Sequence, residues 1–474
     1  MTTDQSPVIM WFRRDLRLLD HPALDAAVQS GRPVLPVFIL DDQARALGAA
    51  PKWRLGLGLD ALTSSLKACG SRLVLRQGPA LAVLRELIAE TGASAVYWSR
   101  AYDPVAIERD THVKATLTAQ GLQAKSFPGH LLFEPWEVTT KNGQPFRVFT
   151  PMWRAVQHRH VAPPLSKPEN LRPLKAWPRS DLSRSWALGS GMQRGEAIVR
   201  PFVRPGEAAA LDQLDLFLGR LDTYSDRRDL LAEDGTSDLS EYLSLGEISP
   251  RTIWHRVQNA SALGVGGTLA YLRQLVWREF AYHLMYNWPH ILTDNWRQDW
   301  DSFPWQSAPD RPEVTAWRQA RTGVPLVDAG MRELYVTGRM HNRARMIVAS
   351  YLTKHLMAHW RIGMDWFAEC LVDWDPASNA MGWQWVAGSG PDAAPFFRIF
   401  NPETQRKRFD PHSDYLNRWI AEGQQNPPDT ALAYFNAIPR SWGMDPSDPY
   451  PDAVVDLQAG RERALRLYET MKNQ

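Results

Sequence analysis

The sequence predicts two domains: an α/β domain built on a doubly wound parallel sheet, followed by a larger, all-helical domain. Three observations carry this prediction. The 474 residues exceed what one hydrophobic core usually covers. Short apolar runs alternate with helical patterns at the start of the chain, and from residue 201 onward the patterns are mostly helical. We therefore expect domains at residues 1–132 and 201–474, joined by a long connector at 133–200.

The first domain is expected to alternate strands with helices. Short apolar runs predict strands at residues 8–12, 34–40, 73–75 and 95–98. Helical patterns separate them at residues 53–69, 79–91 and 104–119. Because no Gly-x-Gly-x-x-Gly motif opens a helix after a strand, a dinucleotide-dependent dehydrogenase is disfavoured.

Proline dominates the connector, which has little periodicity and is expected to run over the surface as a loop. Its His158-Arg-His160 could suggest a metal site. No cysteine or acidic cluster lies nearby, so a solvated loop is favoured. His355 and His359 have helical i, i+4 spacing but no evident third ligand, and we expect no metal there either.

Composition limits the partners. Lys plus Arg number 54 and Asp plus Glu 52, a net charge of +2, so nucleic acid would have to bind a local basic face. The run Arg406-Lys-Arg408 could provide one, with a solvated surface as the alternative. Two cysteines far apart indicate a reducing cytoplasm, and no apolar run is long enough to predict a membrane span.

Residues 340–385 concentrate unusual polar groups. On a helix, Asn342, Arg345 and Met346 would share one face, which mixes an amide, a cation and a soft apolar group. Burying polar groups costs free energy unless they find hydrogen-bond partners, and a flat cofactor with polar edges would provide such partners. Further polar groups follow shortly after this helix: Asp373, Asp375 and Asn379.

Residues 340–346, 373–379, 383–385 and 392–402 resemble the photolyase/cryptochrome family of flavoproteins, most closely the bacterial class I cyclobutane pyrimidine dimer photolyases. Residues 11–17 are similar to the opening of the family's α/β domain. The resemblance implies a deoxyribodipyrimidine photolyase. Such an enzyme repairs cyclobutane pyrimidine dimers in DNA by light-driven electron transfer from excited, reduced FAD to a flipped-out dimer.

The resemblance also implies a set of FAD contacts. Residues 236–240 alone would suit either a helix N-cap or a phosphate-binding helix start. Relatives usually have a cation at Asp238, and because a diphosphate would repel a carboxylate, we expect Asp238 to point outward. The FAD-binding residues implied are Tyr224, Thr236, Ser237, Asp238, Leu239, Ser240, Arg345, Asp373, Asp375 and Asn379.

Trp305, Trp360 and Trp383 match the family's chain of tryptophans that passes electrons to the flavin, and they join Asn379 and Gln274 as expected catalytic residues. If residues 382–385 are helical, Trp383 and Trp385 point about 200° apart, so one could relay electrons while the other meets substrate. The DNA- and substrate-binding residues implied are Arg228, Gln274, Trp277, Arg278, Asn342, Arg343, Met346, Trp385 and Arg398.

Gln274 departs from the family, because the dimer photolyases usually have Glu at this position. An amide can still hydrogen-bond a thymine but has no proton to lend. Without the resemblance, Trp277 could simply pack in the hydrophobic core, and Arg278 could be a surface side chain with its charged end in solvent.

A second, antenna chromophore is also implied. Two positions that contact folate in relatives fall at Val105 and Ala106, and neither side chain is suitably polar. Methenyltetrahydrofolate is therefore the less favoured antenna chromophore. Deazaflavin, FMN or an empty pocket stay open. The expected partner is ultraviolet-damaged DNA, single- or double-stranded, bound by a monomer without an obligate protein partner.

Two other functions stay open. Eukaryotic (6-4) photolyases place two histidines where this chain has Asn342 and Met346, and the bacterial iron–sulfur type needs four cysteines against two here. A cryptochrome would instead be a blue-light sensor without repair. Plant cryptochromes have Asp where Asn379 stands, and many have long tails.

Overall fold

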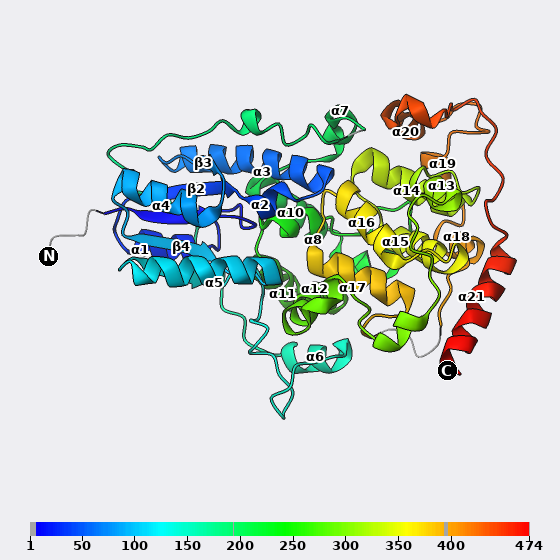
Figure 1. The fold of residues 1–474 in the computed structure, drawn as a ribbon, viewed down its shortest axis with the longest axis horizontal. Coiled ribbons are helices and arrows are strands. Elements are labelled where there is room, and N and C mark those ends of the chain that lie inside the picture. The colour runs from blue at the N-terminus through cyan, green and yellow to red at the C-terminus, as the bar shows by residue number, and fades with distance from the viewer. Residues whose placement is uncertain (1–5, 193, 393–396, 474) are drawn as a thin grey trace.

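The computed structural model describes residues 6–192, 194–392 and 397–473. An α/β part and a helical part lie side by side along the long axis of the molecule (Figure 1). The α/β part is a five-stranded parallel sheet in the order β3-β2-β1-β4-β5. Its strands are β1 (Val8–Phe12), β2 (Val34–Leu40), β3 (Val74–Gln77), β4 (Ala95–Ser99) and β5 (Gln123–Phe127).

The sheet is buried on both faces, as a parallel sheet requires. Alternate residues of β1 enter separate cores: Val8, Met10 and Phe12 lie on one face, and Ile9 and Trp11 on the other. The helices of this part are α1 (Pro22–Gln29), α2 (Asp42–Arg45), α3 (Ala49–Ala68), α4 (Ala80–Thr91) and α5 (Pro104–Ala119). The predicted doubly wound parallel sheet is confirmed.

Three elements of this part were not predicted: β5, α1 and the four-residue helix α2. β5 has the sequence Gln-Ala-Lys-Ser-Phe and lies at the edge of the sheet, where it is partly exposed. A partly exposed strand does not need an apolar run, so the search for apolar runs missed it. The short helix α1 begins at Pro22 and is capped by the ring of His21, which accepts a hydrogen bond from Leu24 N.

The connector is less uniform than its prolines suggest. It contains α6 (Phe149–Val156), whose residues Phe149, Met152, Trp153 and Val156 are buried in the helical core. Beyond α6 the chain is loop, interrupted by the short 3-10 helix η1 (Ser183–Trp186), and it runs along the top edge of the view in Figure 1 toward α7 (Glu196–Val199). The proposed boundaries at 132 and 200 stay a prediction.

The rest of the chain is helical, without a strand among its described residues. Its longer helices enclose the site described below. The helices are η1 (Ser183–Trp186), α7 (Glu196–Val199), η2 (Arg200–Phe202), α8 (Glu207–Leu218), η3 (Leu221–Thr223), α9 (Tyr224–Arg227), α10 (Ser240–Leu245), α11 (Pro250–Ala262), α12 (Thr268–Asn287), η4 (Pro289–Leu292), η5 (Gln298–Ser302), α13 (Pro312–Arg318), α14 (Pro325–Thr337), α15 (Asn342–Ser350), the π-helix η6 (Tyr351–His355), α16 (Trp360–Cys370), α17 (Pro376–Ala387), α18 (Pro402–Phe409), α19 (Asp414–Trp419), α20 (Asp429–Ala437), η7 (Arg440–Trp442) and α21 (Leu457–Lys472). None of the helices among the described residues combines the length and apolarity that crossing a membrane requires.

Buried ion pairs join the two parts. Arg54 of α3 is fully buried and pairs with Glu241 and Glu247 of the helical part. Gly246 lies in the left-handed region at φ 66°, and a Cβ there would overlap the backbone of Arg14. Because a buried charge that loses its partner is strongly destabilising, this joint holds the two parts in one relative position.

Candidate active site

A polar cluster joins α10, α15 and the start of α17. Asp373 Oδ2 accepts hydrogen bonds from Arg345 Nη2 at 2.8 Å and from Ser240 Oγ at 2.7 Å. Arg345 Nε also donates to Met340 O at 2.8 Å. The other carboxylate oxygen, Asp373 Oδ1, is buried without a partner among the described residues. A buried acceptor left unsatisfied is costly, so the cluster fits a ligand that brings an N–H or O–H group.

Asp375 begins α17. Its carboxylate accepts from Ser378 N at 2.9 Å and from the Tyr282 hydroxyl, and pairs with Arg14 at 3.4 Å. Burial opposes ionisation, but Arg14 and Arg278 nevertheless hold the pKa of Asp375 below its ordinary value. Asp375 is therefore a fixed negative charge at the head of α17.

Asn379 lies one turn into α17, where its Nδ2 donates to Met364 O at 3.0 Å. Three residues later, the Cβ direction of Gly382 meets open space. Residues three apart share a helix face, so α17 presents an oriented amide beside an unfilled volume. Together with Asp373 Oδ1, this arrangement fits a flat group with polar edges, such as the flavin of FAD.

In the segment of residues 236–240, Asp238 points outward, as we expected. Asp238 is exposed at φ 53°, and its Oδ1 accepts from Thr236 Oγ1 at 2.8 Å. Leu239 is buried, whereas Ser237 is half-buried. Nearby, Tyr224 packs against Phe217 and Tyr271, and the Arg228 guanidinium lies 5.5 Å from its ring.

The three tryptophans that we expect to form the relay are buried, with exposures of 8% for Trp305, 0% for Trp360 and 3% for Trp383. The ring of His359 lies between two of them, with its centroid 5.4 Å from Trp305 and 5.2 Å from Trp360. A Cβ at Gly363 would overlap the Trp383 ring, so α16 brings Trp383 against the face that also carries Trp360. The sequence did not predict the place of His359 in this path.

Two of these three indole N–H groups are held by neutral acceptors, whereas Trp383 Nε1 is buried without a partner among the described residues. Trp305 Nε1 donates to Thr353 O at 3.0 Å, and Trp360 Nε1 donates to Asn295 Oδ1 at 2.8 Å. A carbonyl or amide oxygen cannot take the proton, so these rings keep their N–H.

Two further tryptophans are half-buried. Trp277 of α12 stacks on Phe149, with ring centroids 3.8 Å apart and planes 8° apart. Trp385 donates from Nε1 to Asp392 O at 3.1 Å. Trp383 is thus buried while Trp385 reaches the surface, which is the split that their 200° separation on a helix predicts.

Polar residues accompany this pair. Asn342 is exposed, and its Nδ2 lies 3.9 Å from the sulfur of Met346. Arg343 reaches the same sulfur at 3.8 Å and pairs with Asp229 at 2.8 Å. Gln274 is half-buried on α12, and its side chain makes none of the hydrogen bonds between described residues.

Arg278 does not lie as expected. We predicted that it would hold DNA phosphates, but its side chain is 11% exposed and donates to His130 O at 3.0 Å. Burial and the neighbouring Arg278 lower the pKa of His130 well below its ordinary value, so the ring is neutral. The position of Arg278 on α12 could be predicted, whereas its capture by a residue far away in the sequence could not. Arg398, by contrast, is exposed 6.0 Å from the Trp385 ring.

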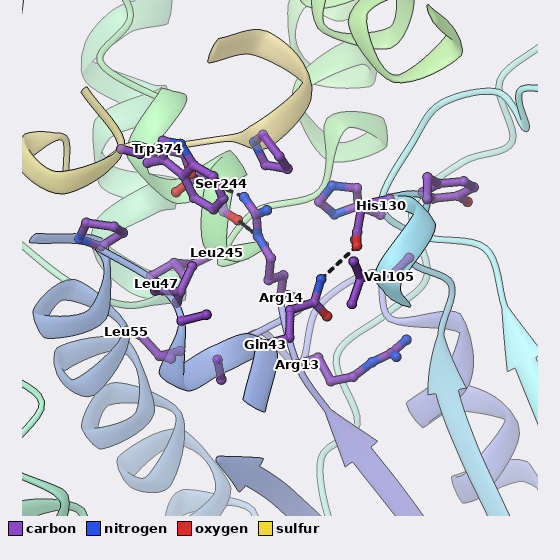
Figure 2. Close-up of a pocket in the computed structure, with 18 of the residues that line it drawn as sticks. Arg13, Arg14, Gln43, Leu47, Leu55, Val105, His130, Ser244, Leu245 and Trp374 are labelled. Carbon is purple, nitrogen blue, oxygen red and sulfur yellow. Dashed lines mark hydrogen bonds between the residues drawn. The ribbon is translucent and has the colours of Figure 1, made fainter. Parts of the chain in front are cut away.

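A cavity of about 410 Å³ lies between the two parts (Figure 2). It opens where β1, β2 and β4 end, next to the point where the strand order reverses, the usual place for ligands in such sheets. Val105 lines it and is 61% exposed, whereas Ala106 is 1% exposed. Its lining residues include Arg13, Arg14, Gln43, Leu47, Leu55, Val105, His130, Ser244, Leu245, Trp374, Met364 and Asn379.

The charges around this cavity are mostly paired. Arg13 pairs with Asp110 and Arg109 pairs with Asp41, each at 2.7 Å. Arg14 crosses the cavity, as Figure 2 shows, and donates from Nε to Ser244 O at 2.7 Å. What remains is a largely apolar slot with polar edges, which fits a flat aromatic ligand.

Comparison with known proteins identifies both parts. The family described as DNA photolyase matches residues 8–169, and the family described as FAD binding domain of DNA photolyase matches residues 271–470. A deoxyribodipyrimidine photo-lyase of Agrobacterium fabrum is 44% identical, covering 100% of this chain and 99% of that protein. Cryptochrome-1 of Arabidopsis thaliana is 35% identical, covering 98% of this chain and 70% of that protein.

Solved structures agree. A bacterial class III photolyase from Agrobacterium tumefaciens matches with a TM-score of 0.91 and 43% identity, covering 100% of this chain and 99% of that one. An archaeal photolyase from Sulfolobus tokodaii, solved with two FAD molecules, matches with a TM-score of 0.80 and 28% identity, covering 98% and 100%. The expected nearness to class I is corrected by the class III match. The motifs that carried the resemblance did not separate the two classes, and residues 393–396 of one of them lie outside the described residues.

Proposed function

The chain belongs to the photolyase/cryptochrome family, and we propose that it is a deoxyribodipyrimidine photolyase, which uses light to repair cyclobutane pyrimidine dimers in DNA. The observation that carries this proposal is the pairing of a buried polar cluster suited to FAD with two half-buried tryptophans whose rings are supported from the protein side. The full-length photo-lyase relative supports the same activity.

FAD, when bound, supplies the light-driven electron transfer, since the cofactor carries the chemistry. The protein's own groups hold it. Asp373 offers its unpaired oxygen, Arg345 and Ser240 fix that carboxylate, and Asn379 presents an amide held by Met364 O. Tyr224 and residues 236–240 would line the remainder of the cofactor, with Asp238 directed to solvent.

The lesion would leave the DNA stack and lie between Trp277 and Trp385, because unpaired bases stack on aromatic faces. Met346 would support it, while Asn342 and Gln274 would hydrogen-bond its polar edges. DNA phosphates would meet Arg343, Arg398 and the exposed Lys407 and Arg408, a grip that weakens with salt and does not depend on sequence.

We further propose that the cavity between the two parts receives a second chromophore. It lies at the carboxyl edge of the sheet and reaches Asn379, so light absorbed there would be collected next to the flavin site. The chromophore class stays open between a deazaflavin, FMN and methenyltetrahydrofolate.

One experiment tests the activity. Purified protein with FAD and a reductant is illuminated together with ultraviolet-damaged oligothymidylate, and thymine absorbance is followed. Recovery of absorbance in light but not in darkness is expected. Recovery only with (6-4) products would identify the other repair activity. Failure with both lesions, despite normal flavin photochemistry, would identify a light sensor.

A further inference from the structure

The segment that follows the π-helix η6 is held against the residue next to Trp305. Gln306 N donates to Met357 O at 2.8 Å, and His359 N donates to Gln306 O at 2.9 Å, which forms an isolated parallel β-bridge. Met357 adopts φ 52°, a left-handed conformation that is uncommon outside glycine. The backbone on both sides of this bridge therefore determines where the side chain of His359 lies relative to Trp305.

The ring of His359 contacts two indoles of the expected relay. It meets Trp305 edge-on, with centroids 5.4 Å apart and planes at 73°, and it lies tilted by 35° against Trp360, with centroids 5.2 Å apart. Among the described residues, the ring contacts connect Trp305 to Trp360 through His359 and not directly. The imidazole thus occupies the space through which an electron would pass between the two indoles.

The charge of this ring suits that position. Burial, together with the nearby Arg361, lowers the pKa of His359 to about 4, so the half-buried imidazole is neutral at pH 7. Trp305 and Trp360 donate their N–H groups to neutral oxygens, so an indole that loses an electron here keeps its proton and carries a positive charge. A neutral ring does not repel this charge, whereas a second cation at the same distance would.

We infer that His359 is part of the electron relay, as the bridge through which an electron passes from Trp305 to oxidised Trp360. Trp360 is oxidised by way of Trp383 when bound, oxidised FAD is excited by light. One electron then leaves Trp305 and restores Trp360, while the imidazole stays neutral and no proton moves. A soluble thiol finally returns an electron to Trp305, which at 8% is the most exposed of the three indoles. The inference rests on the proposed function, because it concerns the flavin that this function requires.

His359 also has a structural role, and two substitutions separate this role from the bridge. Its Nδ1 accepts from Arg361 N at 3.2 Å and so caps α16. His359→Asn keeps an acceptor for the cap and removes the ring, whereas His359→Phe keeps a ring and removes the cap. His290→Asn is the matched control, because the exposed His290 stacks on Trp296, outside the relay, with centroids 5.8 Å apart.

The test follows indole radicals by transient absorption after a laser flash, in protein that holds oxidised FAD and is supplied with a thiol. Trp305→Phe shows the result when the last step is lost, because oxidised Trp360 then recovers its electron from the flavin. His359→Asn should reproduce these kinetics, with a several-fold lower yield of long-lived indole radical and of reduced flavin. His359→Phe should retain most of the yield, and His290→Asn all of it.

Thermal unfolding of the same variants, with and without FAD, measures the cap independently of the relay. His359→Phe should lower the melting temperature by about 2 °C, and His359→Asn by less, because only the first change removes the cap acceptor. The two variants should therefore rank in opposite order for stability and for radical yield.

A radical yield in His359→Asn equal to that of the parent protein would overturn the inference. A loss in His359→Phe as large as that in His359→Asn would also overturn it, because the effect would then belong to the cap. Equal yields in Trp305→Phe and the parent protein would do the same, since no electron would come from Trp305. Dimer repair by chemically reduced parent protein is measured separately, and its absence would refute the proposed function without changing the result for His359.

Discussion

The tryptophans on the two sides of the proposed flavin site lie in different surroundings, which suit the two different roles that we propose for them, an electron relay and a lesion-binding surface. On the relay side, Trp305 and Trp360 are buried and their N–H groups donate to neutral protein oxygens. On the lesion side, Trp277 and Trp385 are half-buried and supported from behind by Phe149 and Asp392. A ring that passes electrons needs close aromatic neighbours and a retained proton, whereas a ring that receives a base needs one open face.

The comparison also shows where the two sides meet. The π-helix η6 supplies Thr353 O to Trp305 on the relay side. The next residue, Lys354, donates to Arg398 O at 3.4 Å and lies 3.7 Å from the Phe397 ring on the lesion side. Changes in one side should therefore leave the other intact unless they pass through η6.

The largest expected effect is on the relay. Trp360→Phe should abolish photoreduction of oxidised flavin, because phenylalanine is much harder to oxidise than indole and also loses the bond to Asn295. Chemically reduced protein should still repair. Flavin absorbance under blue light, with Trp254→Phe as a buried control in α11, measures this. Normal photoreduction in Trp360→Phe would mean that electrons take another path and would remove the contrast between the two sides.

A smaller effect is expected at Asn379, between the two sides. Asn379→Asp adds a negative charge beside a cofactor that gains negative charge on reduction, so it should lower the flavin midpoint potential. A tenfold change in the redox equilibrium corresponds to about 59 mV for one electron, and we expect a shift of that order. Spectroelectrochemical titration measures it. Asn287→Asp, which alters another amide that donates to a backbone carbonyl, serves as the control. Equal potentials would place Asn379 away from the flavin.

Lys354 offers a pH test of η6. Burial lowers the pKa of its amine well below the ordinary value. Below about pH 10.4 the unfolded chain protonates this amine, whereas the folded protein does not until pH falls to the lowered pKa. Within that window the unfolded chain binds more protons, so this group makes stability rise with pH.

Lys354→Met should therefore raise the melting temperature at pH 7, and the gain should shrink as pH approaches 10. The lost bond to Arg398 O should weaken lesion binding by about threefold, in proportion to a modest hydrogen bond, while photoreduction is unchanged. Thermal unfolding across pH measures the first effect. A pH-independent loss of stability would show that the amine is charged in the folded protein.

Much of this arrangement could be predicted from the sequence, and the failures have physical causes. The central strands were predicted because parallel strands are continuous apolar runs, while β5 was missed because an edge strand need not be one. The positions of the motifs in the sequence predicted that Asp373 belongs to a polar cluster and that Trp383 and Trp385 point in different directions. The contacts of Arg278 with His130 and of Trp277 with Phe149 join segments far apart in sequence, and spacing along one helix does not determine them.

The smallest effect is expected at Gln274, on the lesion side. Glu could offer the lesion a charged hydrogen bond or a proton, whereas the amide makes neutral bonds worth about 1 kcal/mol, against about 1.5–3 kcal/mol for charged ones. Gln274→Glu does not change the stacking faces or the phosphate contacts, which supply most of the binding. The affinity for damaged DNA should therefore stay within about threefold of the parent value. The difference should appear in the quantum yield of dimer splitting, which we expect to rise, with Gln424→Glu unchanged. Binding assays and actinometry separate the two quantities. If affinity falls tenfold or the yield drops, the walls formed by Trp277 and Trp385 are matched to the amide, and the lesion that they recognise differs from the one proposed here.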